Sequence, residues 1–143
     1  MRYVRSRPGP AQASWLDVFR ALRHRTLNRL QVAHGWAQLG EEEAARAALE
    51  EYLLEEQRLT ALLSSVSRRD QRMLLTLLAR CEREGRPLRI TGTARRYERS
   101  QAAAGLAALQ RVVSTSGLGT VEIVLLPDGV RVQVVEGGSQ GVR

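Results

Sequence analysis

His24 and Asn28 are the two side chains of this sequence whose types and spacing best suit chemistry. They stand one helical turn apart, and Asn28 is the only asparagine in the chain. At about 100° per residue, His24 falls nearly opposite the expected apolar side of its helix, on a polar side that also carries Gln31. A solvent-facing imidazole presents an unprotonated nitrogen near neutral pH, and that nitrogen can attack phosphorus while neighbouring amides hold the ring or the phosphoryl oxygens. On spacing alone, an ordinary exposed histidine is the competing interpretation.

The remaining residue types argue against several other kinds of site. Cys81 is the only cysteine and lies within an apolar run, so we interpret it as a small core residue. The second histidine, His34, turns a different way on the helical wheel and is interpreted as a flanking or packing residue. With so few ligands at workable spacing, we expect no metal and no cofactor.

The net charge of +7 comes entirely from arginine, because the sequence holds 22 arginines and no lysine. The arginines are scattered, and few aromatic residues stand beside them to stack on bases, so we disfavour nucleic-acid binding. No apolar run approaches the roughly 20 residues that cross a bilayer, and the first residues lack the apolar core of a signal peptide. These features predict a soluble, cytoplasmic protein that does not associate with membranes.

A helical hairpin over residues 14–67 is expected to position His24. Residues 1–13 show no periodicity and are predicted to form a flexible leader. Ser14 is suited to begin a helix and Gly40 to end it, and the acidic residues 41–43 begin a second helix almost at once. A connection this short makes the two helices antiparallel. The first helix places six apolar residues along one side: Trp15, Phe19, Leu22, Leu30, Ala33 and Ala37.

The second helix carries an apolar stripe, from Ala45 to Val66, that is wider than one partner helix requires. A lone hairpin cannot cover both of its apolar sides, so we predict a homodimer in which two hairpins form a four-helix bundle. The alternative is a monomer in which the C-terminal half of the chain covers the hairpin. Trp15 and Trp36 are expected to be core or dimer-interface anchors.

The pattern changes after Ser67, and residues 68–136 are predicted to form a small α/β unit. The expected helices cover residues 70–84 and 98–113, and the expected strands cover residues 88–91, 119–126 and 130–135, the last two joined by a turn at residues 127–129. Residues 137–143 are expected to be a disordered tail. The predicted fold class is therefore α+β, a helical hairpin followed by a small α/β unit.

Six residues around the histidine keep a defined spacing: Arg23, His24, Asn28, Leu30, Gln31 and Gly35. In this register the segment resembles the phosphoacceptor helix of the sporulation initiation phosphotransferase B family and of related sensor kinases, which carry an RHD-x-x-N-x-L-Q-x-x-x-G pattern. The sequence QLGEEEAARAALEEY that follows is similar to the hairpin turn and second helix of that family. The resemblance covers about residues 17–52, and the rest of the chain agrees in its order of elements.

The resemblance implies a phosphorelay phosphotransferase of a two-component system. His24 would accept a phosphoryl group from the aspartyl-phosphate of one response-regulator receiver domain and pass it to another, with the receiver contributing the aspartate and the metal. Arg23, Arg25 and Arg29 would form a basic surround that helps an acidic receiver pocket to bind. Asn28 and Gln31 would complete the binding residues.

Arg25 departs from the family, which places an acidic residue directly after the histidine. An arginine can neither accept a proton nor orient the imidazole as a carboxylate does. The C-terminal half is similar, in its order of elements, to a shortened and degenerate form of the ATP-binding domain of histidine kinases, but no asparagine follows Asn28 to bind magnesium. We therefore expect transfer of phosphate from a protein and no ATP-dependent kinase activity.

Two other functions stay open at this point. A catalytically silent dimeric adaptor would keep the scaffold and bind a receiver or a kinase without chemistry, and Arg25 is the residue that favours it. A basic nucleic-acid-binding protein is the third hypothesis, and it rests on net charge alone.

Overall fold

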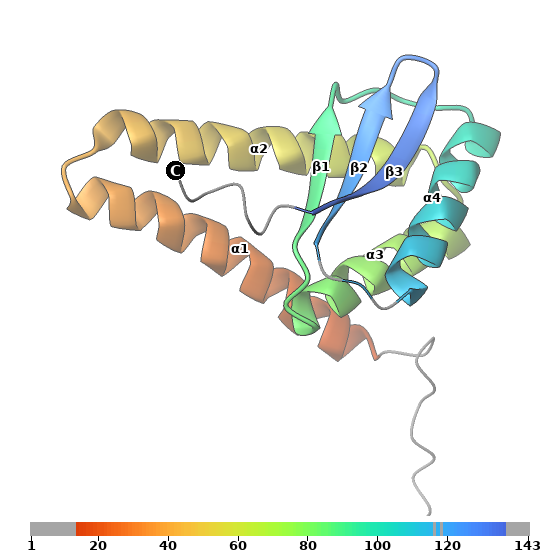
Figure 1. The fold of residues 1–143 in the computed structure, drawn as a ribbon, viewed down its shortest axis with the longest axis horizontal. Coiled ribbons are helices and arrows are strands. Elements are labelled where there is room, and N and C mark those ends of the chain that lie inside the picture. Colours follow the sequence, from red (N-terminus) through yellow and green to blue (C-terminus); the bar gives the residue numbers. More distant parts are fainter. Residues whose placement is uncertain (1–13, 116, 118, 137–143) are drawn as a thin grey trace, which may run out of the picture.

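Four helices and one three-stranded sheet make up the computed structural model, which describes residues 14–115, 117 and 119–136 (Figure 1). In chain order the elements are α1 (Trp15–Gln38), α2 (Glu42–Ser64), α3 (Arg68–Arg83), β1 (Leu88–Gly92), α4 (Arg99–Ser114), β2 (Thr120–Leu126) and β3 (Gly129–Val135). The α+β class is confirmed, and each of these elements begins and ends within two residues of its predicted bounds. The predicted leader and tail, residues 1–13 and 137–143, lie outside the described residues. None of the described helices combines the length and apolar character needed to cross a membrane.

α1 and α2 lie side by side as an antiparallel hairpin (Figure 1). The hydroxyl of Ser14 accepts a hydrogen bond from the backbone N–H of Asp17 and so caps α1. Beyond the end of α1, Gly40 has a φ of +76°, a left-handed conformation that glycine adopts without strain. Glu42 and Glu43 occupy the first turn of α2, where negative charge interacts favourably with the helix dipole.

α3, α4 and the sheet form the α/β unit. β2 is the central strand, pairing in parallel with β1 and antiparallel with β3. The chain crosses over between the parallel strands through α4, because two parallel strands cannot be joined by a tight turn. α3 begins at Arg68, two residues before its predicted start, since the hydroxyl of Ser67 caps it by accepting a hydrogen bond from the backbone N–H of Asp70.

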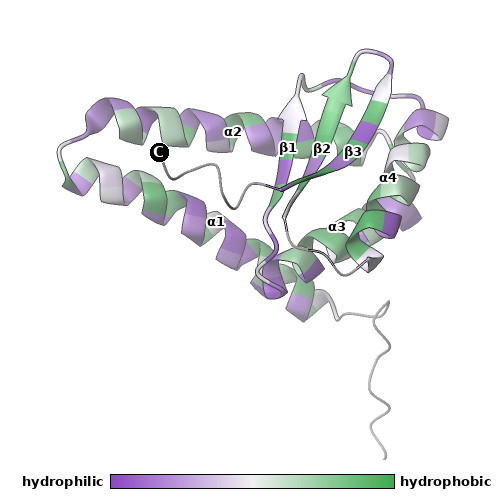
Figure 2. Ribbon diagram, in the orientation of Figure 1, coloured by the Kyte–Doolittle hydropathy of each residue, from purple (hydrophilic) through white to green (hydrophobic). Residues whose placement is uncertain are grey.

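One hydrophobic core joins the second half of the hairpin to the α/β unit. It includes four nearly inaccessible side chains from α2, α3, β1 and β2: Leu62, Leu74, Ile90 and Ile123. A smaller cluster packs α3 against α1 through Val18, Ala21 and Ala79. The C-terminal half therefore covers part of the hairpin within one chain, while the turn end of the hairpin extends beyond the sheet (Figure 1). Hydrophobic residues continue along α1 and α2 into that extended part (Figure 2).

The buried side of α1 differs from the predicted one. Trp15, Phe19 and Leu30 were expected on the packed side, but they are 52%, 62% and 42% exposed. The buried residues of α1 are Val18, Ala21, Arg25 and Ala33. α1 carries apolar residues on two sides, and periodicity alone does not decide which side packs. Trp15 is therefore no core residue of the single chain, and the guanidinium of Arg72 lies over its ring, 5.3 Å from the centroid.

Arg25 points into the hairpin and forms a buried ion pair with Glu55 of α2. Arg29 donates to the same carboxylate oxygen at 2.9 Å, and a second carboxylate, on Glu56, lies 3.7 Å from Arg25 Nη1. The expectation that Arg25 belongs to an exposed basic surround of His24 is therefore wrong. Its charge is buried between two helices and is already paired, so it is not presented to the surface of a partner protein.

Glu55→Ala is expected to lower the free energy of unfolding by about 3 kcal/mol or more, because it leaves the Arg25 charge buried without its partner. Urea unfolding followed by circular dichroism measures the change. Glu51→Ala is the matched control on the same helix, since Glu51 is about half exposed and its ion pair with Arg58 is expected to contribute no more than about 1 kcal/mol. Equal losses in the two variants would contradict a structural role for Glu55.

Candidate functional site

His24 lies on the side of α1 that faces the end of α3. Its Nδ1 atom is 2.8 Å from a carboxylate oxygen of Glu82. The amide nitrogen of Asn28, one turn further along α1, lies 3.4 Å from that same oxygen and 3.4 Å from Nδ1. An imidazole, a carboxylate and an amide thus meet in what we call the His24–Glu82–Asn28 cluster.

The carboxylate of Glu82 determines which ring nitrogen of His24 is open. An ionised carboxylate only accepts hydrogen bonds, so Nδ1 carries the proton between the two groups. In the neutral ring, Nε2 then holds a lone pair and no proton. The His24 side chain is 65% exposed and that of Glu82 22%. The ring is therefore open to an incoming group, while the carboxylate that orients it is sheltered.

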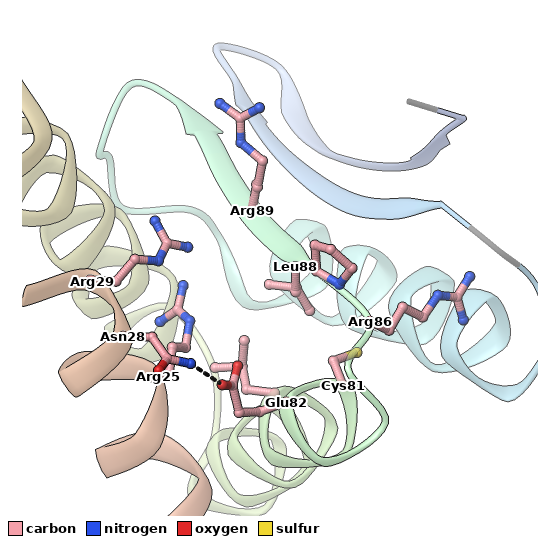
Figure 3. Close-up of a pocket in the computed structure, with 10 residues that line it drawn as sticks. Arg25, Asn28, Arg29, Cys81, Glu82, Arg86, Leu88 and Arg89 are labelled. Atoms are coloured by element: carbon pink, nitrogen blue, oxygen red, sulfur yellow. Dashed lines mark hydrogen bonds between the residues drawn. The ribbon is translucent and has the colours of Figure 1, made fainter. Parts of the chain in front are cut away.

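Asn28 supports Glu82 rather than the ring. Its amide nitrogen is a donor, and a protonated Nδ1 offers it no lone pair, so the Glu82 oxygen is its acceptor through a long hydrogen bond of 3.4 Å. Figure 3 shows Asn28 on α1 reaching toward Glu82 on α3. The predicted closeness of Asn28 to His24 is confirmed, and what joins them is a third residue from another element.

Gln31 and Arg23, the other predicted binding residues, lie apart from this cluster. Both are exposed residues of α1. Gln31 follows His24 by two helical turns, and Arg23 is turned away from His24 by about 100° around the helix. Neither side chain forms a hydrogen bond to the cluster among the described residues. The structure therefore brings together His24 and Asn28 from the predicted set, but not Arg23, Arg25 or Gln31.

Glu82 is the residue of the cluster that sequence analysis missed. It stands 58 residues after His24, near the end of α3, in a charged stretch that is typical of a solvated helix end. This end of α3 lies next to His24 because Ala79 packs against Val18 and Ala21 of α1. Ala79 and Glu82 are three residues apart and so share one helix face, but this spacing becomes informative only once α3 is known to pack on α1.

A pocket of about 340 Å³ adjoins the cluster between α1, α3 and β1 (Figure 3). Asn28 and Glu82 line it, and four arginines line it as well: Arg25, Arg29, Arg86 and Arg89. The remaining lining residues are Leu78, Cys81, Pro87 and Leu88. Burial raises the pKa of the Cys81 thiol, so this side chain is a neutral part of the wall near neutral pH. We call this feature the arginine pocket.

Glu82→Ala is expected to shift the ring proton of neutral His24 from Nδ1 toward Nε2, because the acceptor at Nδ1 is lost. Long-range ¹H–¹⁵N spectra of the neutral imidazole report which nitrogen is protonated. Glu84→Ala is the control, since Glu84 is also near the end of α3 but accepts a hydrogen bond from Arg80. A tautomer ratio that is the same in wild type and Glu82→Ala would show that Glu82 does not orient the ring.

The assignment of the site to His24 depends on its surroundings: an exposed imidazole, a carboxylate at Nδ1, and an amide that supports the carboxylate. The resemblance of residues 17–52 to a phosphotransferase family comes from a short motif. Comparison of the whole chain with protein-family models, curated proteins and solved structures finds no match.

Proposed function

We propose that this protein is a phosphorelay phosphotransferase, in which His24 accepts a phosphoryl group from the aspartyl-phosphate of one response-regulator receiver and passes it to another. The observation that carries the proposal is the exposed His24 ring with the Glu82 carboxylate 2.8 Å from Nδ1, because this contact leaves Nε2 as the nucleophile. The resemblance around His24 to the sporulation initiation phosphotransferase B family supports the same assignment.

The proposed step exchanges one bond for another. The lone pair of Nε2 forms a bond to phosphorus while the bond from phosphorus to the aspartate oxygen breaks, and the electron pair leaves with the aspartate carboxylate. The phosphorylated ring keeps its proton on Nδ1 and carries a positive charge. Glu82 already lies at Nδ1, so its carboxylate stabilises that charge without rearrangement. Transfer to the second receiver is the reverse of this step, and each receiver supplies its own aspartate and metal ion.

In this proposal Glu82 replaces the acidic residue that the family places directly after its histidine. Arg25 stands at that position and is paired with Glu55 inside the hairpin. The carboxylate comes from α3 instead, so phosphoryl transfer depends on the packing of the α/β unit against the hairpin. Glu82 is thus a positioning residue that acts through the imidazole.

Phosphorylation of His24 by ATP is not part of the proposal. The sequence has no asparagine beyond Asn28 that could bind magnesium in the manner of the kinase domain that the C-terminal half resembles. Transfer from an aspartyl-phosphate needs no nucleotide site, because its transition state is stabilised mostly by position and by charges already in place.

His24→Gln is expected to abolish labelling of the protein by a ³²P-phosphorylated receiver, because the accepting nitrogen is removed. The wild type is expected to acquire label that is labile in acid and stable in alkali, as phosphohistidine is. His34→Gln is the matched control and is expected to keep the label. Glu82→Gln is expected to slow labelling by roughly tenfold to a hundredfold, because the charge at Nδ1 is no longer neutralised.

Label that persists in His24→Gln would overturn the site assignment. A receiver that binds the protein tightly without labelling any residue would favour the second candidate function, a dimeric adaptor that binds a receiver without chemistry. The presence of Arg25, in place of an acidic residue directly after His24, is the observation that favours the adaptor.

We further propose that two hairpins pair as a homodimer with a four-helix bundle. An exposed apolar stripe runs along α1, formed by Leu16, Phe19, Leu27 and Leu30, and Leu49 and Leu53 of α2 are exposed as well. The α1 members lie roughly opposite Arg25 and Val18, on the side away from α3. A two-fold pairing would bury the same stripe on both copies, which is the economical way to cover it.

Phe19→Glu is expected to convert the dimer to a monomer in sedimentation velocity, because it places a charge within the proposed apolar interface. Val32→Glu is the matched control: Val32 is also an exposed apolar residue of α1, but it lies near the Arg25 side of the helix. Sedimentation of the wild type as a monomer over the same concentrations would overturn the dimer.

A further inference from the structure

A second pocket lies where the start of α1 meets the first half of α3. Its volume of about 560 Å³ is within the range of small-molecule sites. The residues that line it are Trp15 of α1 and Arg68, Arg69, Gln71, Arg72 and Leu75 of α3. We call it the Trp15 pocket. It shares no lining residue with the arginine pocket, and Glu82 of the His24–Glu82–Asn28 cluster lies near the other end of α3.

The three arginines of the Trp15 pocket are neighbours on one helix. Arg68 and Arg72 are four residues apart and Arg69 and Arg72 are three apart, and both spacings place side chains next to each other on a helix surface. The guanidinium carbon of Arg72 lies 5.3 Å from the centroid of the Trp15 ring. Leu75, one turn further along, packs against the small cluster that joins α3 to α1. Three guanidinium groups, an indole ring and an apolar side chain therefore line the same space.

The protein itself does not balance the charges of these arginines. All 15 acidic residues of the chain lie in the part that the structure describes, and none of them forms an ion pair with Arg68, Arg69 or Arg72 there. Arg68 and Arg69 also stand in the first turn of α3, where positive charge interacts unfavourably with the helix dipole. Neither ion pairing nor helix stability accounts for this concentration of positive charge.

Trp15 adds an aromatic surface to the charged wall. The residue is 52% exposed, so Arg72 covers its ring only in part. A planar ring that remains open beside a pocket offers a surface on which another aromatic ring can stack. The arginines offer several hydrogen-bond donors in fixed, planar groups, which suit the oxygens of a phosphate. The pocket therefore presents recognition groups for a planar ring and for an anionic group.

We propose that the Trp15 pocket binds a nucleotide, with the base stacked on Trp15 and the phosphate held by the three arginines. Stacking on an aromatic side chain is available to every base, and guanidinium groups bind phosphate strongly. An acidic peptide would use the charges of the pocket and leave the indole ring without a partner. The nucleotide is either a free molecule or one unit of a single-stranded nucleic acid, since both present the same chemistry. This site does not depend on the proposed function of His24.

Stacking is tested on the full chain carrying Trp36→Phe, in which Trp15 is the one remaining tryptophan. Adenosine monophosphate and a short oligothymidylate are the probes, and at least one of them is expected to quench the Trp15 fluorescence saturably, after correction for absorption by the probe. Ribose 5-phosphate, which carries the phosphate without a base, is expected to leave the fluorescence nearly unchanged. Fluorescence that no probe quenches saturably would overturn the proposed site.

Isothermal titration calorimetry measures the contribution of each side chain with the same probes. Affinity is expected to be about tenfold weaker in Arg69→Gln and in Trp15→Leu, because a charge-assisted contact or a stacking contact is lost. Both residues are exposed, so these replacements are not expected to disturb folding. Arg83→Gln is the matched control, because it removes the same charge from an exposed position at the other end of α3, and it is expected to bind as the wild type does.

Equal weakening in Arg69→Gln and Arg83→Gln would overturn the site, because the effect would then come from net charge alone. Polyglutamate that binds as tightly as oligothymidylate would overturn the nucleotide in favour of an acidic protein segment. Stronger binding of adenosine monophosphate than of oligothymidylate would assign the site to a free nucleotide, and the reverse order would assign it to single-stranded nucleic acid.

Discussion

The packing of α3 against α1 is the interaction on which the candidate site depends. Val18 and Ala21 of α1 meet Ala79 of α3, and these short side chains let the two helices approach closely. One turn beyond Ala79, the same face of α3 brings Glu82 to 2.8 Å from His24. The arginine pocket also lies along this junction, with β1 as its third side. If the two helices did not pack, His24 would be an ordinary exposed histidine and the pocket would lose one of its walls.

The ion pair between Arg25 and Glu55 sets the rotation of α1. Successive residues of a helix are turned by about 100°, so a helix that points Arg25 toward α2 presents His24 toward α3. A buried pair of charges gains little net stability, because both charges lose their hydration, but a wrong rotation would leave Glu55 buried without a partner. The arginine that departs from the family motif is thus an anchor of the hairpin rather than part of a binding surface.

The two sides of α1 serve different proposed roles. One side meets α3 and carries the His24–Glu82–Asn28 cluster, and the other carries the exposed stripe of Leu16, Phe19, Leu27 and Leu30. Pairing of two hairpins through the stripe would therefore leave His24 accessible to a receiver. The arginine pocket lies beside the cluster, between α1, α3 and β1.

Local sequence by itself determined the secondary structure and two of the three residues of the cluster. Ser14 and Gly40 act on backbone groups within a few positions, so the ends of α1 could be predicted from them. The spacing of His24 and Asn28 already placed both on one helix face. Only the tertiary structure decided which apolar side of α1 is buried, that Arg25 pairs with Glu55, and that Glu82 reaches His24. The physical reason is the distance along the chain: Arg25 and Glu55 are 30 residues apart, and His24 and Glu82 are 58 residues apart. Such partners are brought together by side-chain packing between helices, because the backbone preference of a short segment acts only on its near neighbours.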